Sequence, residues 1–341
     1  MYKSEIRSLT GIRGVAAIYV MFYHYFESIQ STKLPKSHLE TFINHGYLCV
    51  DLFFILSSVL MCITAKKFTQ KLTPNDYLIF MKKRFARIYP LYFVILMFSF
   101  LILKCNNTAG LITSLFLVST IFYKKGQILQ PLWSLSAEWI MYLIFPFLLY
   151  GISRIPRKLS IISLPLISFL FLYFIALKLK SLGYYTVLNI VSINGLTRCF
   201  ADYLLGIAIF LVPSRARHVI SGTAAQILTV GLVIASLCLI YTDILVIFFF
   251  GLLILLLLED NGLISKLLGL NILYTLGLLS YSIYLIHYLF IYTPYMKYAS
   301  HEAIGILYRL ASSLFTIILS FFSYRFIELP AGKYLRKKLI C

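Results

Sequence analysis

The sequence contains few charged residues, and acidic residues are especially scarce. Of its 341 residues only 13% are Asp, Glu, Lys or Arg, and only 12 are acidic. A soluble domain carries about 25% charged residues, so a sizeable soluble domain is excluded. The six cysteines form no CxxC pair and have no histidine at ligand spacing, so we expect neither a disulfide framework nor a metal site. The lack of internal repeats argues against an inverted-repeat transporter.

Hydrophobic residues make up 60% of the chain, and apolar runs of roughly 17–22 residues recur along it. They predict an all-α integral membrane protein, a bundle of about ten transmembrane helices. The predicted spans are residues 9–26, 47–65, 88–103, 133–151, 159–177, 198–212, 224–240, 244–258, 272–293 and 303–324. The first run is not a cleaved signal peptide, because it contains Arg13 and His24 and no small-residue cleavage pattern follows it.

The distribution of basic residues orients these spans. The net charge of +19 follows the positive-inside rule rather than indicating nucleic-acid binding. Residues 109–123 are too few for an ordinary span; if they do not cross, the inside segments hold 21 Lys and Arg and the outside segments hold 8. If they cross, the counts become 15 and 14. We therefore predict that both termini are cytoplasmic and that residues 109–123 form a short re-entrant or interfacial helix on the outer side.

Arg13 and His24 lie eleven residues apart in the first span. On a helix they share a face and are separated by roughly 16 Å along the axis. Ionisable groups are costly in lipid and usually line a functional cavity. Imidazole can serve as a general base near neutral pH, so His24 is the candidate base. A histidine that is merely hydrogen-bonded near the membrane interface is the simpler alternative.

A second polar group begins the fourth span, at the outer side. Pro131 sets up the helix start, and the following sequence is LWSLSAEWIMY. Ser134 and Glu138 share a face, with Tyr142 one turn further. An N-capping serine with an acidic first turn would explain Ser134 or Ser136 alone. Glu138 enters an apolar span and needs a partner, for which the predicted topology offers His24.

A third group lies at the cytoplasmic start of the third span. Arg84 and Arg87 can both reach one phosphate cluster, because guanidinium suits bidentate phosphate contacts. The simpler alternative is positive-inside charge, followed by Pro90 in the first helical turn.

A fourth group lies in the ninth span, where Ser280, Tyr284 and His287 fall on one helix face. They form either the wall of a polar tunnel or polar contacts between helices. Arg198 and Asp202, at i and i+4, are expected to neutralise each other.

Seven segments, in order along the chain, resemble the membrane-bound acyltransferase-3 family. The family's hallmark is an Arg or Lys, ten residues and then a His in the first span, as Arg13 and His24 provide. The second segment is VDLFFILSSVLM, in which Ser58 stands where glycine is usual. The later segments are RFARIYPLY, PLWSLSAEWIMYLIFP, RCFADYLLGI, LGLLSYSIYLIHYLF and SYRFIELPAGKYL.

The resemblance covers nearly the whole chain and implies one transmembrane domain, residues 1–341, similar to stand-alone members without a fused soluble C-terminal domain. It implies transfer of an acyl group, commonly acetyl, from cytosolic acyl-CoA to a hydroxyl of an extracytoplasmic carbohydrate. The implied donor is acetyl-CoA or another acyl-CoA, such as succinyl-CoA, with no metal. The implied acceptor is a surface polysaccharide or glycolipid, such as lipopolysaccharide. The implied location is a bacterial inner (plasma) membrane.

These inferences combine into a mechanism in which the CoA phosphates bind Arg84, Arg87 and Arg13. His24 would deprotonate the acceptor hydroxyl, with Glu138 or a neighbouring serine orienting its imidazole. Because no serine or cysteine stands out as a nucleophile, direct transfer is favoured over a covalent intermediate. The alternatives are a transporter or flippase for a polar or lipid-linked substrate, and a structural or sensory scaffold. Acyl-CoA turnover by the purified protein would separate them.

Overall fold

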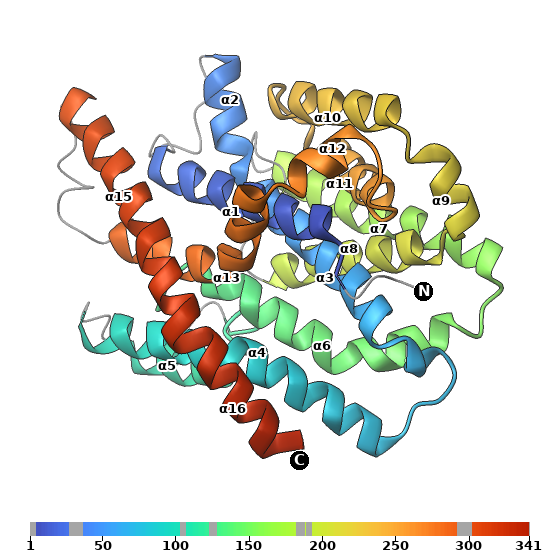
Figure 1. The fold of residues 1–341 in the computed structure, drawn as a ribbon, viewed down its shortest axis with the longest axis horizontal. Helices are drawn as coiled ribbons and strands as arrows, with labels where there is room; N and C mark the ends of the chain where they lie inside the picture. The colour runs from blue at the N-terminus through green and yellow to red at the C-terminus, as the bar shows by residue number, and fades with distance from the viewer. Residues whose placement is uncertain are drawn as a thin grey trace.

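The computed structural model describes residues 5–26, 37–102, 107–122, 128–181, 188, 193–291 and 302–340. Within these ranges the chain forms helices and no strand (Figure 1). The α-helices of the first half are α1 (Arg7–Phe26), α2 (His38–Asn44), α3 (Cys49–Thr64), α4 (Pro74–Leu101), α5 (Thr108–Leu115), α6 (Leu132–Ile152) and α7 (Arg157–Ser181). Those of the second half are α8 (Ile193–Leu211), α9 (Ser214–Ile220), α10 (Thr223–Leu237), α11 (Asp243–Leu257), α12 (Leu263–Leu268), α13 (Asn271–Ile291), α15 (Glu302–Ser323) and α16 (Leu329–Ile340). Short 3₁₀ turns η1 (His45–Leu48) and η2 (Lys66–Thr69) flank α3, and the π-helical segment η4 (Tyr324–Glu328) joins α15 to α16.

The all-α membrane architecture predicted from the apolar runs is confirmed. In the described ranges seven helices are long and apolar enough to cross a membrane, and α9 with α10 forms a bent eighth. The two other predicted spans coincide with α1, of 20 residues, and α11, of 15 residues. The total of ten crossings and the side of the termini stay predictions. In the 109–123 region α5 has eight residues, about 12 Å of helix, which is too short to cross.

The third predicted span begins earlier than expected. The prediction that Pro90 lies in a first helical turn is wrong, because α4 starts at Pro74 and Pro90 lies in its interior. The Thr73 side chain accepts a hydrogen bond from the backbone N–H of Asp76, which caps the helix. The basic segment that contains Arg84 and Arg87 is therefore helical, and it presents both arginines from a rigid element.

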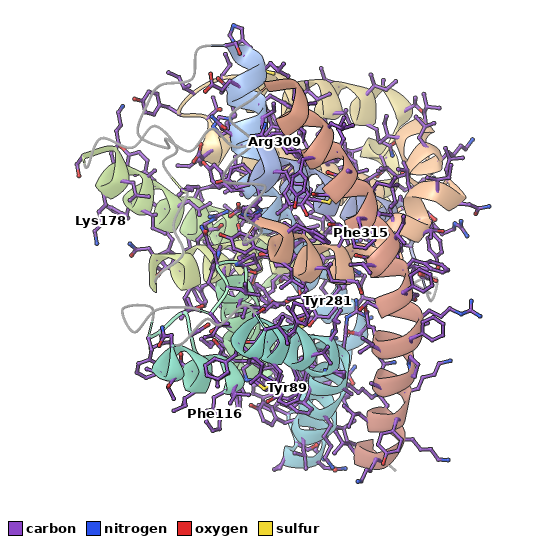
Figure 2. All side chains as sticks on the ribbon, turned by 90° about the vertical axis from the view of Figure 1, so that its left-hand side faces the viewer. Tyr89, Phe116, Lys178, Tyr281, Arg309 and Phe315 are labelled. Atoms are coloured by element: carbon purple, nitrogen blue, oxygen red, sulfur yellow. The ribbon has the colours of Figure 1, made fainter. Side chains whose placement is uncertain are left out.

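The helices divide into a buried centre and a lipid-facing periphery. In its most apolar stretch α3, with the preceding α2 and η1, is 78% buried, whereas the corresponding stretch of α7 is 28% buried. Figure 2 shows Phe116 and Lys178 at the edge of the bundle, and both side chains are exposed. Exposed apolar side chains on α7 and α15 are those expected of helices in contact with lipid.

Close helix crossings place the polar residues. The helices α1 and α13 pack against each other (Figure 1), and a β-carbon on Gly277 would lie 1.9 Å from the carbonyl oxygen of Thr10. A β-carbon on Gly14 would lie 2.6 Å from the backbone nitrogen of Gly277. Only glycine permits this approach, as in other membrane helix pairs with small residues at the contact. The crossing brings the histidines of the two helices together.

The serine that departs from the family pattern is accommodated locally. Ser58 of α3 donates a 2.7 Å hydrogen bond to the carbonyl oxygen of Tyr203 in α8. It packs on Gly206, where a β-carbon would lie 2.5 Å from that of Ser58. A glycine on the facing helix thus provides the space that the serine side chain occupies.

Candidate active site

A cavity of about 270 Å³ opens between α1, α3, α4, α6 and α13. We call it the inner cavity, because it includes Arg84 and Arg87 from the predicted cytoplasmic side. Its charged lining residues are three arginines (Arg13, Arg84 and Arg87) and one carboxylate (Glu138). With cations in excess, the cavity is suited to a polyanion.

The three arginines are held differently. Arg84 donates a 2.9 Å hydrogen bond from Nη2 to Thr64 Oγ1, and its guanidinium lies 5.5 Å from the ring centre of Tyr142. Arg13 and Arg87 make no hydrogen bond or ion pair with any described residue, and both line the inner cavity. Donors of this kind remain available to an incoming phosphate.

Glu138 is fixed inside the inner cavity by two hydroxyl groups. Ser57 Oγ and Tyr142 Oη each donate a 2.6 Å hydrogen bond to Glu138 Oε1. Tyr203 donates in turn to Ser57 Oγ at 3.1 Å. The expectation that Glu138 orients the imidazole of His24 is wrong for this structure. The hydrogen-bond partners of the carboxylate, Ser57 and Tyr142, line the inner cavity, and His24 has a different partner.

His24 lines a second, smaller cavity of about 30 Å³, the outer cavity. This volume is on the order of one water molecule. Its lining residues are Tyr23, His24, Tyr47, Val50, Gln130, Pro131, Trp133, Arg198 and Tyr284. The candidate base therefore faces a small, largely aromatic space that is distinct from the basic inner cavity.

The partner of His24 is His287. The Nδ1 atom of His24 lies 3.1 Å from His287 Nε2 and 3.1 Å from the carbonyl oxygen of Val20. His287 Nδ1 lies 3.1 Å from the carbonyl oxygen of Ile283. Since a carbonyl only accepts, each Nδ1 carries a proton and His287 Nε2 accepts from His24 when both rings are neutral. This assignment leaves the lone pair of His24 on Nε2, which no described residue engages by a hydrogen bond.

A buried ionic network forms the wall behind the outer cavity. Arg198 donates two hydrogen bonds to the carboxylate of Asp51 and a 2.7 Å bond to the carbonyl oxygen of Leu188. The expected neutralisation of Arg198 by Asp202 is therefore wrong: the ion pair links α8 to α3 rather than lying along one helix. Buried charges need several well-placed partners, and Arg198 has them.

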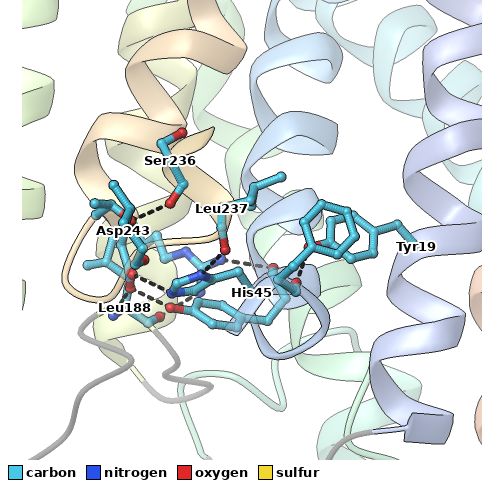
Figure 3. A network of polar contacts seen from close by, with 11 residues as sticks. Tyr19, His45, Leu188, Ser236, Leu237 and Asp243 are labelled. Atoms are coloured by element: carbon cyan, nitrogen blue, oxygen red, sulfur yellow. Dashed lines mark hydrogen bonds and ion pairs between the residues drawn. The ribbon is translucent and has the colours of Figure 1, made fainter. Parts of the chain in front are cut away.

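The network continues to Asp243, at the start of α11 (Figure 3). Tyr47 donates to its carboxylate, the backbone N–H of Leu188 donates at 2.8 Å, and His45 Nε2 lies 3.5 Å away. His45 Nδ1 lies 2.8 Å from the carbonyl oxygen of Leu237. These bonds tie α3, α8, α10 and α11 together and hold Tyr47 and Arg198 at the outer cavity.

Two residues, Val50 and Tyr284, line both cavities. The hydroxyl groups of Tyr284 and Ser134 are 2.7 Å apart, and Tyr284 also donates to the carbonyl oxygen of Pro131 at 3.4 Å. The shared boundary is therefore a hydrogen-bonded contact between α13 and α6.

Most of the other predicted residues gather at this boundary or in the inner cavity. Ser134, Tyr142, Ser280 and Tyr284 line the inner cavity. Ser136 does not: its hydroxyl donates to the carbonyl oxygen of Leu117 and accepts from the backbone N–H of Thr120. The prediction that Ser136 lines a passage is wrong, because the side chain anchors the segment that follows α5.

His287 also lies outside the lining of both cavities and supports His24 from behind. The capping alternative for Ser134 is not formed either, since its hydroxyl donates to the carbonyl oxygen of Pro131. A polar face on α13 predicted a role for His287. Its partner, His24, lies 263 residues away in the sequence and is brought close only by the packing of α1 on α13.

Sequence reasoning missed three residues of the site. Ser57 lies in an apolar span whose sequence gives no sign of its role, and the position of Asp51 near the start of the second predicted span does not identify Arg198 as its partner. Glu328 accepts a 3.0 Å hydrogen bond from Ser282 and lies within electrostatic range of Arg13 and Arg87. Its position just beyond the end of the tenth predicted span gave no indication that it faces α13.

The fold and these two cavities define a class, a polytopic membrane protein with a cationic and a histidine-lined space that meet inside the bundle. Residues 6–325 match the acyltransferase domain family known as acyltransferase 3, and the chain belongs to that family. Two curated proteins are similar: an acyltransferase designated MdmB from Streptomyces mycarofaciens and protein 2 of the picA locus from Rhizobium radiobacter.

MdmB is 28% identical over 170 residues, which are 45% of this chain and 42% of that protein. The picA locus protein is 34% identical over 111 residues, 31% of this chain and 49% of that protein. The matched segments thus span less than half the length of these relatives. No solved structure matches the chain significantly.

Proposed function

We propose that this protein transfers an acyl group, acetyl in the first instance, from a cytosolic acyl-CoA to a hydroxyl of an extracytoplasmic carbohydrate. The main observation that supports this proposal is the pairing of His24 with His287, which leaves His24 Nε2 without a hydrogen bond from any described residue. His24 lines the outer cavity, and Tyr284 lines both this cavity and the arginine-lined inner cavity. Family membership supports acyl transfer. The donor, the acceptor and a bacterial inner-membrane location are parts of the proposal.

The inner cavity is the proposed donor site. The phosphates of acyl-CoA bind Arg84 and Arg87 at its mouth, with Arg13 deeper along α1. The pantetheine arm then extends toward Tyr284 and delivers the thioester to the boundary. Glu138, held by Ser57 and Tyr142, keeps the tyrosine hydroxyl in place beside this path.

The chemical step takes place beside His24. Nε2 removes the proton from the acceptor hydroxyl while its oxygen forms a bond to the acyl carbon. The carbon–sulfur bond breaks and CoA leaves as a thiolate, which takes up the proton. The imidazolium formed on His24 is stabilised because its Nδ1–H donates to His287 Nε2.

The proposal is tested with purified full-length protein and radiolabelled acetyl-CoA. We expect label to appear in a surface-carbohydrate acceptor and free CoA to accumulate in equal amount. Succinyl-CoA serves as the competing donor, and comparison of surface-glycan O-acetylation with and without the gene identifies the acceptor in cells. Absence of both transfer and acyl-CoA hydrolysis would refute the proposal; acceptor movement without acyl-CoA consumption would favour a transporter.

A further inference from the structure

A third cavity, of about 400 Å³, lies apart from the two already described. It is formed by η2, the α6–α7 junction and the α8–α9 junction, and we call it the α7 cavity. It is lined by Lys66, Thr69, Ile152, Ser153, Ile155, Arg157, Ser160, Phe210, Leu211, Val212, Ser214 and Arg217. None of these residues lines the inner or the outer cavity, so the donor site does not account for it.

The α7 cavity is cationic. Its described lining contains Lys66, Arg157 and Arg217 and no acidic residue. The Arg217 charge is compensated by Glu259, with Nε 2.7 Å from Oε1. Arg157 donates from Nε to the carbonyl oxygen of Leu211 at 2.6 Å, which places the guanidinium at the cavity. Its Nη groups and the Lys66 ammonium make no hydrogen bond within the described part of the chain.

Two further donors point to an anion. The cavity lies at the N-terminus of α7, a 25-residue helix whose first-turn N–H groups have no partner inside the helix. Ser160 is only 1% exposed, lines the cavity, and its hydroxyl has no hydrogen-bond partner among the described residues. A buried hydroxyl without a partner is unfavourable, and a bound oxyanion would supply the acceptor.

The position of the cavity indicates where the anion comes from. Its lining residues lie in, or at the ends of the spans beside, the predicted cytoplasmic segments that follow the second, fourth and sixth spans. Directly beyond it along α7, Leu159, Ile162 and Leu166 are exposed apolar side chains. A phospholipid of the cytoplasmic leaflet could lay its acyl chains on this face and place its headgroup in the cavity.

We propose that the α7 cavity is a phosphate-binding site that takes the headgroup phosphate of an anionic phospholipid. Arg157 and Lys66 neutralise the phosphate, Ser160 and the first turn of α7 donate hydrogen bonds, and the apolar face of α7 receives the chains. A soluble phosphate ester presents the same chemistry, and the experiment separates the two sources.

The experiment measures lipid binding to purified full-length protein by native mass spectrometry, with phosphatidylglycerol and phosphatidylcholine as probes. The test variant is Lys66→Gln with Arg157→Gln. The matched control is Lys71→Gln with Lys158→Gln, which removes the same charge from exposed neighbours outside the cavity. We expect the affinity of the test variant for phosphatidylglycerol to fall by on the order of tenfold. The control should bind this lipid like the unchanged protein.

Inorganic phosphate and CoA are then added alone, with thermal shift as the readout. Stabilisation that is lost in the test variant and kept in the control supports the site and assigns it to a soluble phosphate. Ser160→Ala, which leaves the charge unchanged, should weaken binding of the same probe a few-fold. Equal binding by the test and control variants, or equal affinity for the two lipids without any phosphate or CoA effect, would overturn the proposal.

Discussion

The inner and outer cavities differ in volume, in charge and in how their side chains are held. The inner cavity has about 270 Å³ and three arginines, of which Arg13 and Arg87 make no hydrogen bond with a described residue, whereas the outer cavity has about 30 Å³ and a histidine held by another histidine. Behind the outer cavity the wall is braced by the Asp51–Arg198 ion pair and the Asp243 network. The difference indicates that one space is suited to capture a large charged substrate, and the other to hold one reacting group in place.

The largest expected effect comes from removing the proposed base. His24→Ala should lower acyl transfer by about 10²–10⁴-fold, because no other described residue that lines the outer cavity is a histidine, an aspartate or a glutamate. The binding of CoA to the inner cavity should be unchanged, as isothermal titration would measure. His218→Ala, an exposed histidine on α9, is the control and should retain full activity. Near-normal turnover in His24→Ala would contradict the assignment of His24 as the general base.

His287 is a positioning residue, and its replacement should be less severe. His287→Leu should reduce kcat by about tenfold, the effect of losing one buried hydrogen bond that holds the imidazole of His24. His287→Gln should recover part of the loss, since its amide oxygen can accept from His24 Nδ1. The pH profile of kcat separates this role from simple packing: a profile unchanged in both variants would contradict it.

Changing the inner cavity should alter donor affinity more than turnover. Arg84→Ala with Arg87→Ala should raise the KM for acyl-CoA by about 10- to 100-fold, since each charged contact contributes about 1.5–3 kcal/mol. The KM for the acceptor should change little. Lys82→Ala with Lys83→Ala removes the same charge from residues of α4 that do not line the cavity. A rise in the KM for the acceptor that exceeds the rise in the KM for acyl-CoA would contradict the assignment of the inner cavity to the donor.

The boundary between the cavities can be loosened without removing the aromatic ring. Tyr284→Phe loses the contacts with Ser134 and Pro131, so the ring should swing aside more often. We expect acyl-CoA hydrolysis without acceptor to rise by about two- to tenfold, the equilibrium shift for one hydrogen bond. Hydrolysis is measured as free thiol. A rate equal to that of the unchanged protein would show that this contact does not control passage.

The smallest effect on chemistry should come from Ser136. Ser136→Ala removes two buried hydrogen bonds to the segment after α5, so it should lower stability by about 1–2 kcal/mol. Turnover at a temperature well below unfolding should be unchanged. Thermal unfolding followed by intrinsic fluorescence measures the loss of stability. A fall in kcat of the folded protein would support the original prediction that Ser136 lines the passage.

The fold could be predicted well because each apolar run is long enough to need a helix. Every predicted span coincides with a helix, although the third was started too late. The Lys- and Arg-rich segment before Ile88 was left outside the predicted spans, whereas Thr73, Pro74 and Asp76 form an ordinary helix start. This helix-start pattern is visible in the sequence, and it is a stronger indication of where the helix begins than the basic charge of the segment.

The composition of the site could be predicted, and its pairings could not. Polar side chains in apolar spans indicate that a partner exists, and they do not identify it. The partner of His24 was set by the glycine contact between α1 and α13, and that of Arg198 by the packing of α8 on α3. Such pairings join residues more than 140 positions apart, beyond any periodicity argument.

The hydrogen-bonded contact of Tyr284 with Ser134 has a consequence for the cell as well as for the reaction. An enzyme that takes one substrate from each face of a membrane risks short-circuiting the ion gradients across it. Among the described residues the two spaces share Val50 and Tyr284, and the Tyr284 hydroxyl is already hydrogen-bonded. Under the proposed function, this contact would keep the boundary closed to ions between turnovers, and the boundary would open only while the acyl-CoA arm occupies it.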